Sequence, residues 1–349
     1  MRRFSPPKIL LPVMLILPAL LVLLFECLKG QKALMDGWVS GFMAPAEQFL
    51  GRVWSLLPWF SVAEVLTALL LAGSAAWLIR AVVLLVRERA GRRFLRRLLA
   101  FASALLWLWA AVSWMWNAAY YASSFQERSG LKAEPYSVET LAQVTALFAQ
   151  RAAEFSTQVE RDGDGLFAES LEEVFDRGPA VYENLVQEFP FLELEPSVRV
   201  KPLFFSRLQS ILGFTGVYFP FTGEANVNID APACMIPATV AHEMAHQRMV
   251  ASEQEANFVG IAAAVTSGDP VFQYSGYLFG LVQLCNALAP VDRDAWNANN
   301  AYWAELSSPV EETAEQVYDS FLKGNDQELG IRSYGACVDL LVAYFGNNA

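Results

Sequence analysis

Long apolar runs dominate the first third of the chain. Residues 9–28, 62–86 and 98–120 each hold about the twenty apolar residues that a helix needs to cross the hydrocarbon core of a bilayer. We therefore predict three membrane-spanning helices at the N-terminal end. A cleaved signal peptide is the alternative for residues 9–28, but this run exceeds the roughly 7 to 15 apolar residues of a signal peptide, and no A-x-A-like site follows it.

The segment between the first two apolar runs is rich in aromatic residues and poor in charge. Residues 31–57 include Trp38, Phe42 and Trp54, a composition typical of a helix that lies in the membrane interface. We predict an interfacial helix here, with a re-entrant segment as the alternative. Together with the three spans it completes a predicted membrane domain of residues 1–121.

Beyond residue 121, apolar positions recur at three- and four-residue spacing, which is typical of amphipathic helices. The predicted helices cover residues 138–160, 168–188, 206–212, 237–250, 253–266, 271–288, 309–323 and 331–345. Residues 216–230 instead alternate β-branched and aromatic with polar side chains, which predicts extended chain. An edge strand is expected there, because Pro220 cannot donate to a strand ladder. The fold class is mainly α, and we expect residues 122–349 to form an α-rich (α+β) domain with a small sheet or edge strand.

The composition agrees with a chain that is partly embedded in lipid. Of its 349 residues, 54% are hydrophobic and 17% are charged, whereas globular proteins average about 25% charged residues. The net charge is +8 up to residue 120 and −19 after it, which gives the total of −11. The lipid bilayer is therefore a predicted partner, and the acidic second part argues against nucleic acid, which calls for a basic surface.

The basic residues predict the orientation in the membrane, because short loops rich in Lys and Arg stay cytoplasmic. The loop between the second and third runs contains Arg87, Arg89, Arg92, Arg93, Arg96 and Arg97. Arg2, Arg3 and Lys8 put the N-terminus on the same side. Three crossings then place residues 122–349 on the far side, so we expect a multi-pass protein of the cell membrane with an extracytoplasmic C-terminal domain.

Cysteine usage leaves the redox state open. Cys27 lies in the first apolar run, and Cys234, Cys285 and Cys337 lie in the second domain. Three cysteines allow one disulfide with a free thiol, or three free thiols. Their spacing does not resemble a metal-binding knuckle.

The two histidines of the chain are His242 and His246, in the sequence ATVAHEMAHQ. On a helix, residues four apart lie on one face with Cβ atoms roughly 5 to 6 Å apart, so both imidazoles can bind one Zn²⁺. Glu243 is turned about 100° away, where it can take a proton from a metal-bound water without being a ligand. This HExxH motif predicts a catalytic zinc site. The alternative is a pair of surface histidines that only form hydrogen bonds.

A catalytic zinc needs a third protein ligand and an open fourth position. This ligand is expected to be a carboxylate or, with less support, a cysteine, and the nearest acids are Glu253 and Glu255 in SEQEANF. Either requires a turn between Met249 and Ser252, because on a continuous helix Glu255 would face away and Glu253 would lie about 10.5 Å along the axis. Ser252 and Glu255 fit a capping box that would begin a new helix. We favour Glu255 over Glu253, because binding to a buried metal outweighs a cap worth roughly 1 kcal/mol.

These residues resemble a family of bacterial membrane proteins that is known only as a domain of unknown function and is grouped with gluzincin-type zinc peptidases. The resemblance covers most of the chain from residue 120 onward and rests on KPLFFSRLQSILGFTGVYFPFTGEANVNID, PATVAHEMAHQR, SEQEANF, FQYSGYL and SYGACVDLL. Three N-terminal spans also match the family's layout. The resemblance implies a zincin-like fold for residues 122–349 and zinc binding by His242, His246 and Glu255, with Glu243 as catalytic base. The family usually has Gly at the position of Met249, so this chain departs from the pattern at that turn.

Hydrolysis of an amide also needs a group that stabilises the oxyanion, and a tyrosine hydroxyl often fills this role beside zinc. Tyr334, with Arg332 nearby, is the favoured catalytic candidate and Tyr277 is the alternative, although packing in the core explains either tyrosine equally. Asp339 is a candidate partner for the free nitrogen of a zinc-bound imidazole. A cap or an ion pair on a solvated helix face explains Asp339 equally well.

The extended segment 216–230 is a candidate binding edge for a peptide, which would add to it as a further strand. Glu224, Asn226 and Asn228 would then line the cleft, although residues of this kind are also common in turns.

Together these features predict a membrane-anchored zinc metallopeptidase that hydrolyses an extracytoplasmic peptide or envelope protein. An intramembrane protease is disfavoured, because the HExxH segment does not lie in an apolar stretch of about 18 residues. The non-enzymatic alternative is a membrane sensor or scaffold with a structural zinc site. Glu243 separates these functions, since a structural site needs no carboxylate base and closes its fourth position.

Overall fold

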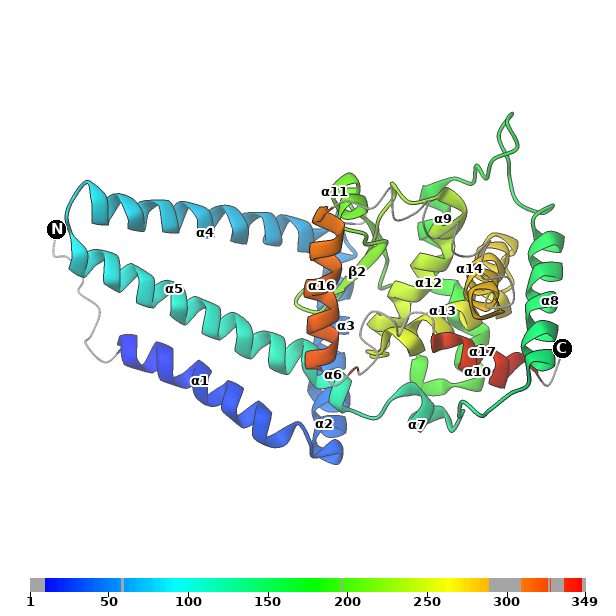
Figure 1. The fold of residues 1–349 in the computed structure, drawn as a ribbon, viewed down its shortest axis with the longest axis horizontal. Helices are drawn as coiled ribbons and strands as arrows, with labels where there is room; N and C mark the ends of the chain where they lie inside the picture. Colours follow the sequence, from blue (N-terminus) through cyan, green and yellow to red (C-terminus); the bar gives the residue numbers. More distant parts are fainter. Residues whose placement is uncertain are drawn as a thin grey trace. The chain divides into compact units, whose positions relative to one another are not determined.

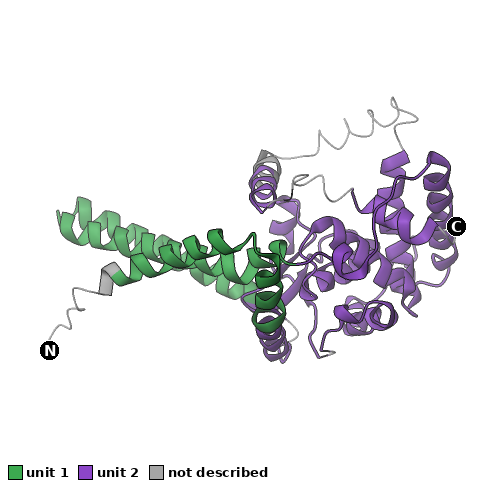
Figure 2. Ribbon diagram, turned by 90° about the horizontal axis from the view of Figure 1, so that it is seen from below, with its two compact units in different colours: residues 1–43, 63–122 green, residues 44–62, 123–349 purple. Residues whose placement is uncertain are grey.

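The chain forms two compact units in the computed structural model, which describes residues 10–57, 60–195, 197–288, 309–325, 327 and 336–346. The first unit comprises residues 1–43 and 63–122, and the second comprises residues 44–62 and 123–349 (Figure 2). The predicted mainly helical fold with a small sheet is confirmed. The second unit includes residues 44–62, which the sequence assigned to the membrane domain.

The first unit is built from apolar helices. They are α1 (Leu10–Leu28), α2 (Lys32–Trp38), the π-helical η1 (Val39–Met43), α4 (Val62–Val86), α5 (Gly91–Val112), the π-helical η2 (Ser113–Asn117) and α6 (Ala118–Tyr121). Two helices, α4 and the stretch Gly91–Tyr121, are long and apolar enough to cross a membrane. Only 11% and 17% of their apolar windows are buried, whereas the core helix of a soluble protein would be covered. These two helices indicate a membrane association, and a third span at α1 stays a prediction.

The predicted interfacial helix, residues 31–57, is divided between the two units. Its first half forms α2 and η1, while its second half forms α3 (Ala44–Trp54), which packs in the second unit against strand β3 (Glu224–Val227). The approach is close, since a Cβ atom on Gly51 would lie 2.7 Å from the carbonyl oxygen of Gly223. The helix α3 therefore supports the sheet of the second unit, which the sequence did not predict.

The helices of the second unit largely follow the predicted apolar spacing. Besides α3 they are α7 (Phe125–Ser129), α8 (Val138–Phe155), α9 (Leu171–Arg177), η3 (Gly178–Tyr182), α10 (Glu183–Glu188), η4 (Pro190–Leu192), α11 (Ser206–Ile211), η5 (Ala233–Met235), α12 (Ile236–Gln247), α13 (Glu253–Thr266), α14 (Pro270–Leu288), α16 (Pro309–Gly324) and α17 (Cys337–Phe345). The predicted helix 168–188 is wrong as one element, because Gly178 and Pro179 introduce a 3-10 turn between α9 and α10. Part of the predicted helix 331–345, residues 331–335, lies outside the described residues.

The sheet of the second unit has three short strands. β1 (Lys201–Pro202) pairs in parallel with β3, and β2 (Gly216–Phe219) pairs antiparallel with β3, so that β3 lies in the centre. The predicted single edge strand over residues 216–230 is therefore a hairpin, which turns at Gly223 with a φ of +66°. β2 is its edge strand and β3 is fully buried.

A buried ion pair ties β1 to β3, and we call it the strand-face cluster. The Lys201 ammonium donates to Glu224 and also to the carbonyl oxygen of Trp54, the last residue of α3. The same Glu224 oxygen accepts the backbone N–H of Val62 at 3.1 Å. Both side chains are almost fully buried, at 0% and 1% exposure. Each charge in this cluster therefore has its partner within the chain.

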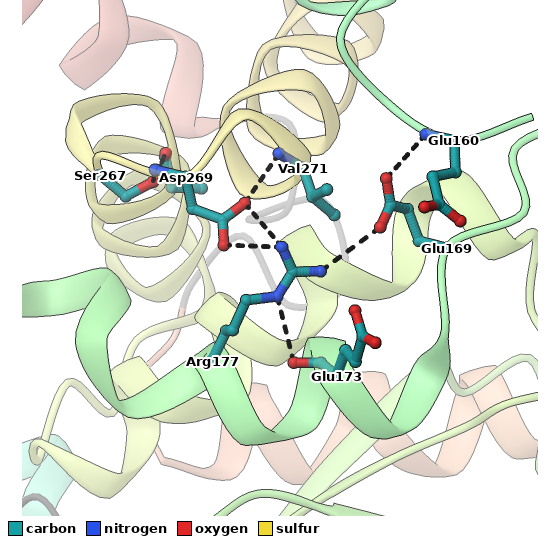
Figure 3. Close-up of polar contacts among 8 residues, drawn as sticks. Glu160, Glu169, Glu173, Arg177, Ser267, Asp269 and Val271 are labelled. Carbon is teal, nitrogen blue, oxygen red and sulfur yellow. Dashed lines mark hydrogen bonds and ion pairs between the residues drawn. The ribbon is translucent and has the colours of Figure 1, made fainter.

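A second polar network holds the turn between α13 and α14, as Figure 3 shows. Arg177 forms ion pairs with Asp269 at 3.1 Å and with Glu169 at 3.5 Å. Asp269 also accepts the backbone N–H of Val271 at 2.8 Å and so caps the first turn of α14. The network therefore fixes the end of α13, whose beginning carries the acidic residues described next.

Candidate metal centre

The two histidines lie on one face of α12, as their spacing predicts. Their ring centroids are 4.9 Å apart, with planes at 87°. His242 is buried and His246 is partly buried. α13 packs closely against this helix, because a Cβ atom on Gly260 would lie 2.8 Å from the backbone nitrogen of His242. The pair is thus held in the interior of the second unit, which excludes the alternative of two surface histidines.

A tight turn between α12 and α13 orients the second histidine. Met249 has a φ of +62°, a left-handed conformation that favours glycine. The turn brings the carbonyl oxygen of Val250 to 2.8 Å from Nδ1 of His246. A carbonyl only accepts, so Nδ1 carries the proton and donates, which leaves the lone pair on Nε2. A backbone carbonyl orients many metal-binding histidines in this way.

Glu253, the first residue of α13, stands opposite both imidazoles. Its Oε2 atom is 3.4 Å from Nε2 of His242 and 3.6 Å from Nε2 of His246. One ligand atom from each of the three residues lies within 4.8 Å of the others, and this is the one such cluster of three among the described residues. Tetrahedral zinc with bonds of about 2.0 to 2.1 Å separates its ligand atoms by about 3.3 Å. The spacing around Glu253 is therefore close to that of a zinc site.

The structure corrects the sequence-based preference for Glu255. The carboxylate of Glu255 accepts the backbone N–H groups of Phe125 at 2.8 Å and Gln126 at 3.0 Å, at the start of α7. It therefore satisfies the N-terminus of a helix 130 residues away in the sequence, where a negative charge is favourable. The expected capping box is also wrong, because within the described part of the chain the Ser252 side chain makes no capping bond to α13.

The buried carboxylates of the cluster favour a positive charge beside them. Burial disfavours ionised Glu253, yet the nearby histidines, His246 foremost, hold the pKa of its carboxyl well below the usual range. Burial likewise opposes a charged His246, but the carboxylates of Glu253 and Glu243 raise its pKa to about 9. Without a metal, a proton on His246 supplies the missing charge. A divalent cation would supply it with neutral imidazoles.

Glu243 lies beside this cluster and is not one of the three convergent ligands. Its pKa is raised to about 7 because the side chain is buried, an effect that the two histidines oppose. The backbone of β2 covers the carboxylate, since a Cβ atom on Gly216 would lie 2.4 Å from its Oε1 atom. A carboxyl group with a pKa near neutrality accepts and returns protons readily, as a general base must.

Three buried polar atoms of the centre test whether a metal fits. His242 Nδ1, Glu243 Oε2 and Glu253 Oε2 have no hydrogen-bond partner in the described structure. Buried polar atoms are nearly always paired, so such orphans need an explanation. A Zn²⁺ ion bound to His242, His246 and Glu253 explains Glu253 Oε2, and the donor set of two imidazoles and one carboxylate is common at catalytic zinc. The residues present therefore fit the metal.

Comparison with known proteins gives the family. Residues 38–342 match the family described as "Protein of unknown function (DUF3810)". The chain belongs to this family. No curated protein and no solved structure shows significant similarity to the chain. The expected membership in a family of unknown function is confirmed, and the grouping with zinc peptidases stays a prediction.

The other predicted site residues lie elsewhere. Tyr334 and Arg332 are outside the described residues. Tyr277 packs in the core, with its ring stacked on Phe155 at 5.9 Å. Asp339 accepts a hydrogen bond from the hydroxyl of Tyr136 at 2.7 Å, so its partner in the structure is a tyrosine.

The residues expected along a peptide cleft are structural. Glu224 belongs to the strand-face cluster. The side-chain amides of Asn226 and Asn228 donate to backbone carbonyls of Val217 and Phe214, which holds the hairpin together. All three lie on or directly after β3, the buried central strand, and so do not line an open cleft.

Two residues beside the centre were not predicted from the sequence. The hydroxyl of Tyr318 on α16 donates to Oε1 of Glu253, the oxygen that does not face the histidines. Gly216 provides the space for Glu243. Both depend on contacts between distant segments, although a glycine at the start of a β-branched run is itself a hint of close packing.

The cysteines do not contribute to the cluster. All four, Cys27, Cys234, Cys285 and Cys337, lie in the described residues and carry free thiols. Burial raises the pKa of Cys337 to about 12, which keeps that thiol protonated. Among the described residues, the side chain that converges with the two histidines is therefore a carboxylate and not a thiol.

Proposed function

We propose that this protein is a membrane-associated zinc metallopeptidase, with His242, His246 and Glu253 as the metal ligands and Glu243 as the general base. The convergence of the three ligand atoms within 4.8 Å carries this proposal. The ligands are rigidly placed, because one helix carries both histidines and the glutamate begins the next. The proposal includes three membrane spans and an extracytoplasmic second unit, which the arginine-rich loop after α4 supports.

The chemistry follows from the neighbouring acid. A zinc ion bound by these residues would act as a Lewis acid and lower the pKa of water to about 7. Glu243 takes a proton from the attacking water and returns it to the amine that leaves when the peptide bond breaks. Its burial keeps its pKa near 7, so that it is able to do both near neutral pH. A purely structural zinc site would have no use for this buried carboxyl group.

The edge of the sheet offers a place for an extended substrate. Among the described strands, β2 is the edge strand beside Glu243, with Gly216 against the carboxylate. A peptide that pairs with β2 would therefore run past the general base. We propose an extracytoplasmic peptide or envelope protein as the substrate class.

The test uses the full chain, purified in detergent and loaded with one equivalent of zinc. Hydrolysis of a degenerate library of quenched-fluorescent peptides is measured for wild type and Glu243→Gln. We expect the variant to keep its zinc and to lose about 10²- to 10⁴-fold in rate, the range typical of a general base. Glu172→Gln, an exposed glutamate on α9, is the matched control and should behave as wild type.

Two results would contradict the proposal in different ways. Unchanged hydrolysis by Glu243→Gln would exclude this residue as the base. A zinc-loaded wild type that cleaves no peptide of the library would exclude the peptidase activity while leaving the metal site in place.

A further inference from the structure

An exposed apolar surface lies on α11 and the loop before it. The large side chains that form it are Phe204, Phe205, Leu208 and Ile211, with Ile229 beside them, and all five are exposed. Phe204 is the most exposed of them, at 82%. We call these five residues the α11 patch. Monomeric soluble proteins seldom gather large apolar side chains in this way, so the patch indicates an interaction surface.

The large apolar side chains of α11 and of the loop before it face outward. Phe204, Leu208 and Ile211 follow helical spacing on the outer face. The buried residue of the helix is Ser206, whose hydroxyl donates to the carbonyl of Leu203 and accepts the N–H of Ile229 at 2.9 Å. A surface helix in water normally turns its apolar residues inward, whereas the exposed side of α11 carries Leu208 and Ile211 together with Arg207. The arrangement on α11 suits an apolar environment.

The α11 patch lies close to the start of the apolar helix α4, which indicates that the nearby apolar environment is the membrane. β1 ends at Pro202, two residues before Phe204, and Lys201 of β1 shares the carboxylate of Glu224 with the backbone N–H of Val62. Val62 is the first residue of α4, a helix long and apolar enough to cross a membrane. Three residues of chain span at most about 11 Å, so the patch starts close to the point where the membrane helix begins.

We propose that the α11 patch inserts into the interfacial layer of the same membrane that α4 enters. The strand-face cluster fixes Val62 on the second unit, so the surface around it is held at the membrane. The guanidinium of Arg207, which is exposed on α11, would remain at the level of the lipid headgroups while the phenylalanines reach the acyl boundary. This inference does not depend on the metal centre.

The experiment labels one residue at a time with 4-trifluoromethylphenylalanine, at position 204 or at position 166. Leu166 is the matched control, because it is 65% exposed and lies in the hairpin after α8, at the opposite end of the second unit from α11 (Figure 1). The full chain is placed in nanodiscs that hold a single copy, with phosphatidylcholine spin-labelled at acyl carbon 5. The ¹⁹F linewidths are compared with those in unlabelled discs.

We expect the spin-labelled lipid to broaden the signal at position 204 about twofold or more, since an interfacial helix sinks roughly 5 to 10 Å into the headgroup and acyl boundary. The signal at position 166 should not change. Equal linewidths at position 204 with and without the spin label would overturn the proposal. So would equal broadening at both positions. Because each disc holds a single chain, a second copy of the protein cannot cover the patch and so keep the spin-labelled lipid away from position 204.

Discussion

Two regions of the second unit bury acidic side chains, and they do so in different ways. In the strand-face cluster, Glu224 is paired with Lys201 and with the backbone N–H of Val62. In the candidate metal centre, Glu253 faces two imidazoles at distances too long for good hydrogen bonds, and its Oε2 atom stays without a hydrogen-bond partner in the described structure. In the first region the carboxylate is paired with a cation of the chain, while in the second one carboxylate oxygen has two imidazoles and no hydrogen-bond partner opposite it in the described structure.

A third buried acid sharpens the contrast. Glu47 on α3 is 1% exposed, and the hydroxyl of Tyr218 donates to it. Burial raises the pKa of Glu47 to about 8, and the tyrosine opposes this only in part. The chain thus buries Glu224 beside a cation, Glu47 in neutral form and Glu253 opposite two imidazoles. Burial of an acid alone is therefore no sign of function, and the unmatched set of ligands is what distinguishes the metal centre.

The largest expected effect comes from removing the cation of the strand-face cluster. Lys201→Met leaves the Glu224 carboxylate buried without its cation, and we expect a loss of about 3 to 5 kcal/mol in the free energy of unfolding. Thermal unfolding of the detergent-purified protein measures it, with zinc binding as a second readout. An unchanged free energy of unfolding in Lys201→Met would show that the Glu224 carboxylate does not depend on this cation, and would contradict the contrast with the candidate metal centre.

Glu47 makes the stability depend on pH in a known direction. Its pKa in the folded protein, about 8, lies above the ordinary value of 4.5, so between these pH values the folded state holds a proton that the unfolded state releases. Stability should therefore fall as the pH rises from about 4.5 to 8, by a few kcal/mol in total. Unfolding curves at several pH values measure this slope. Glu47→Gln should flatten it, and an unchanged slope in that variant would assign the effect to other groups.

Gly216→Ala tests the placement of the general base rather than the ligands. The added Cβ atom would lie 2.4 Å from the Glu243 carboxylate and must displace it. A shift of about 1 Å in a catalytic group costs on the order of 10²-fold in rate. We expect this loss in peptide hydrolysis with the zinc content unchanged. Loss of zinc together with the rate would mean that β2 supports the ligands as well.

The smallest effect concerns the turn between the metal helices. Met249 has a φ of +62°, where a non-glycine residue costs about 1 to 2 kcal/mol. Met249→Gly should therefore raise the free energy of unfolding by about 1 kcal/mol, after the loss of the partly buried side chain is subtracted. A destabilised variant would show that packing of Met249 outweighs its backbone strain.

The sequence predicted most helices because their signals are local. Apolar spacing gave α13 its bounds, residues 253–266, and a long apolar run gave those of α4, residues 62–86. The sequence did not predict the hairpin of β2 and β3, although Thr222 and Gly223 are typical turn residues. Pro220 indicates an edge strand but not the second strand that follows it. The role of α3 in the second unit depends on contacts with a strand 170 residues later and has no local signal.

At the site, the sequence identified the motif but favoured Glu255, whereas the structure brings Glu253 to the histidines. Two residues along a helix correspond to a rotation of about 200°, so Glu253 and Glu255 point in nearly opposite directions. Which one faces the histidines depends on the left-handed turn at Met249 and on the need of α7 for an acidic cap. The residues around the motif predict a turn between Met249 and Ser252, but they show neither its left-handed conformation nor the contact of Glu255 with α7. Tertiary contacts therefore decide which of the two glutamates faces the histidines.

The central claim is that Glu253 completes a metal site with His242 and His246, while Glu255 only caps a helix. Zinc content per chain, measured by mass spectrometry on purified wild type, Glu253→Gln and Glu255→Gln, tests it most directly. We expect about one zinc in wild type and in Glu255→Gln, and a small fraction of this in Glu253→Gln. A metal-free wild type, or loss of zinc from Glu255→Gln with retention in Glu253→Gln, would contradict it.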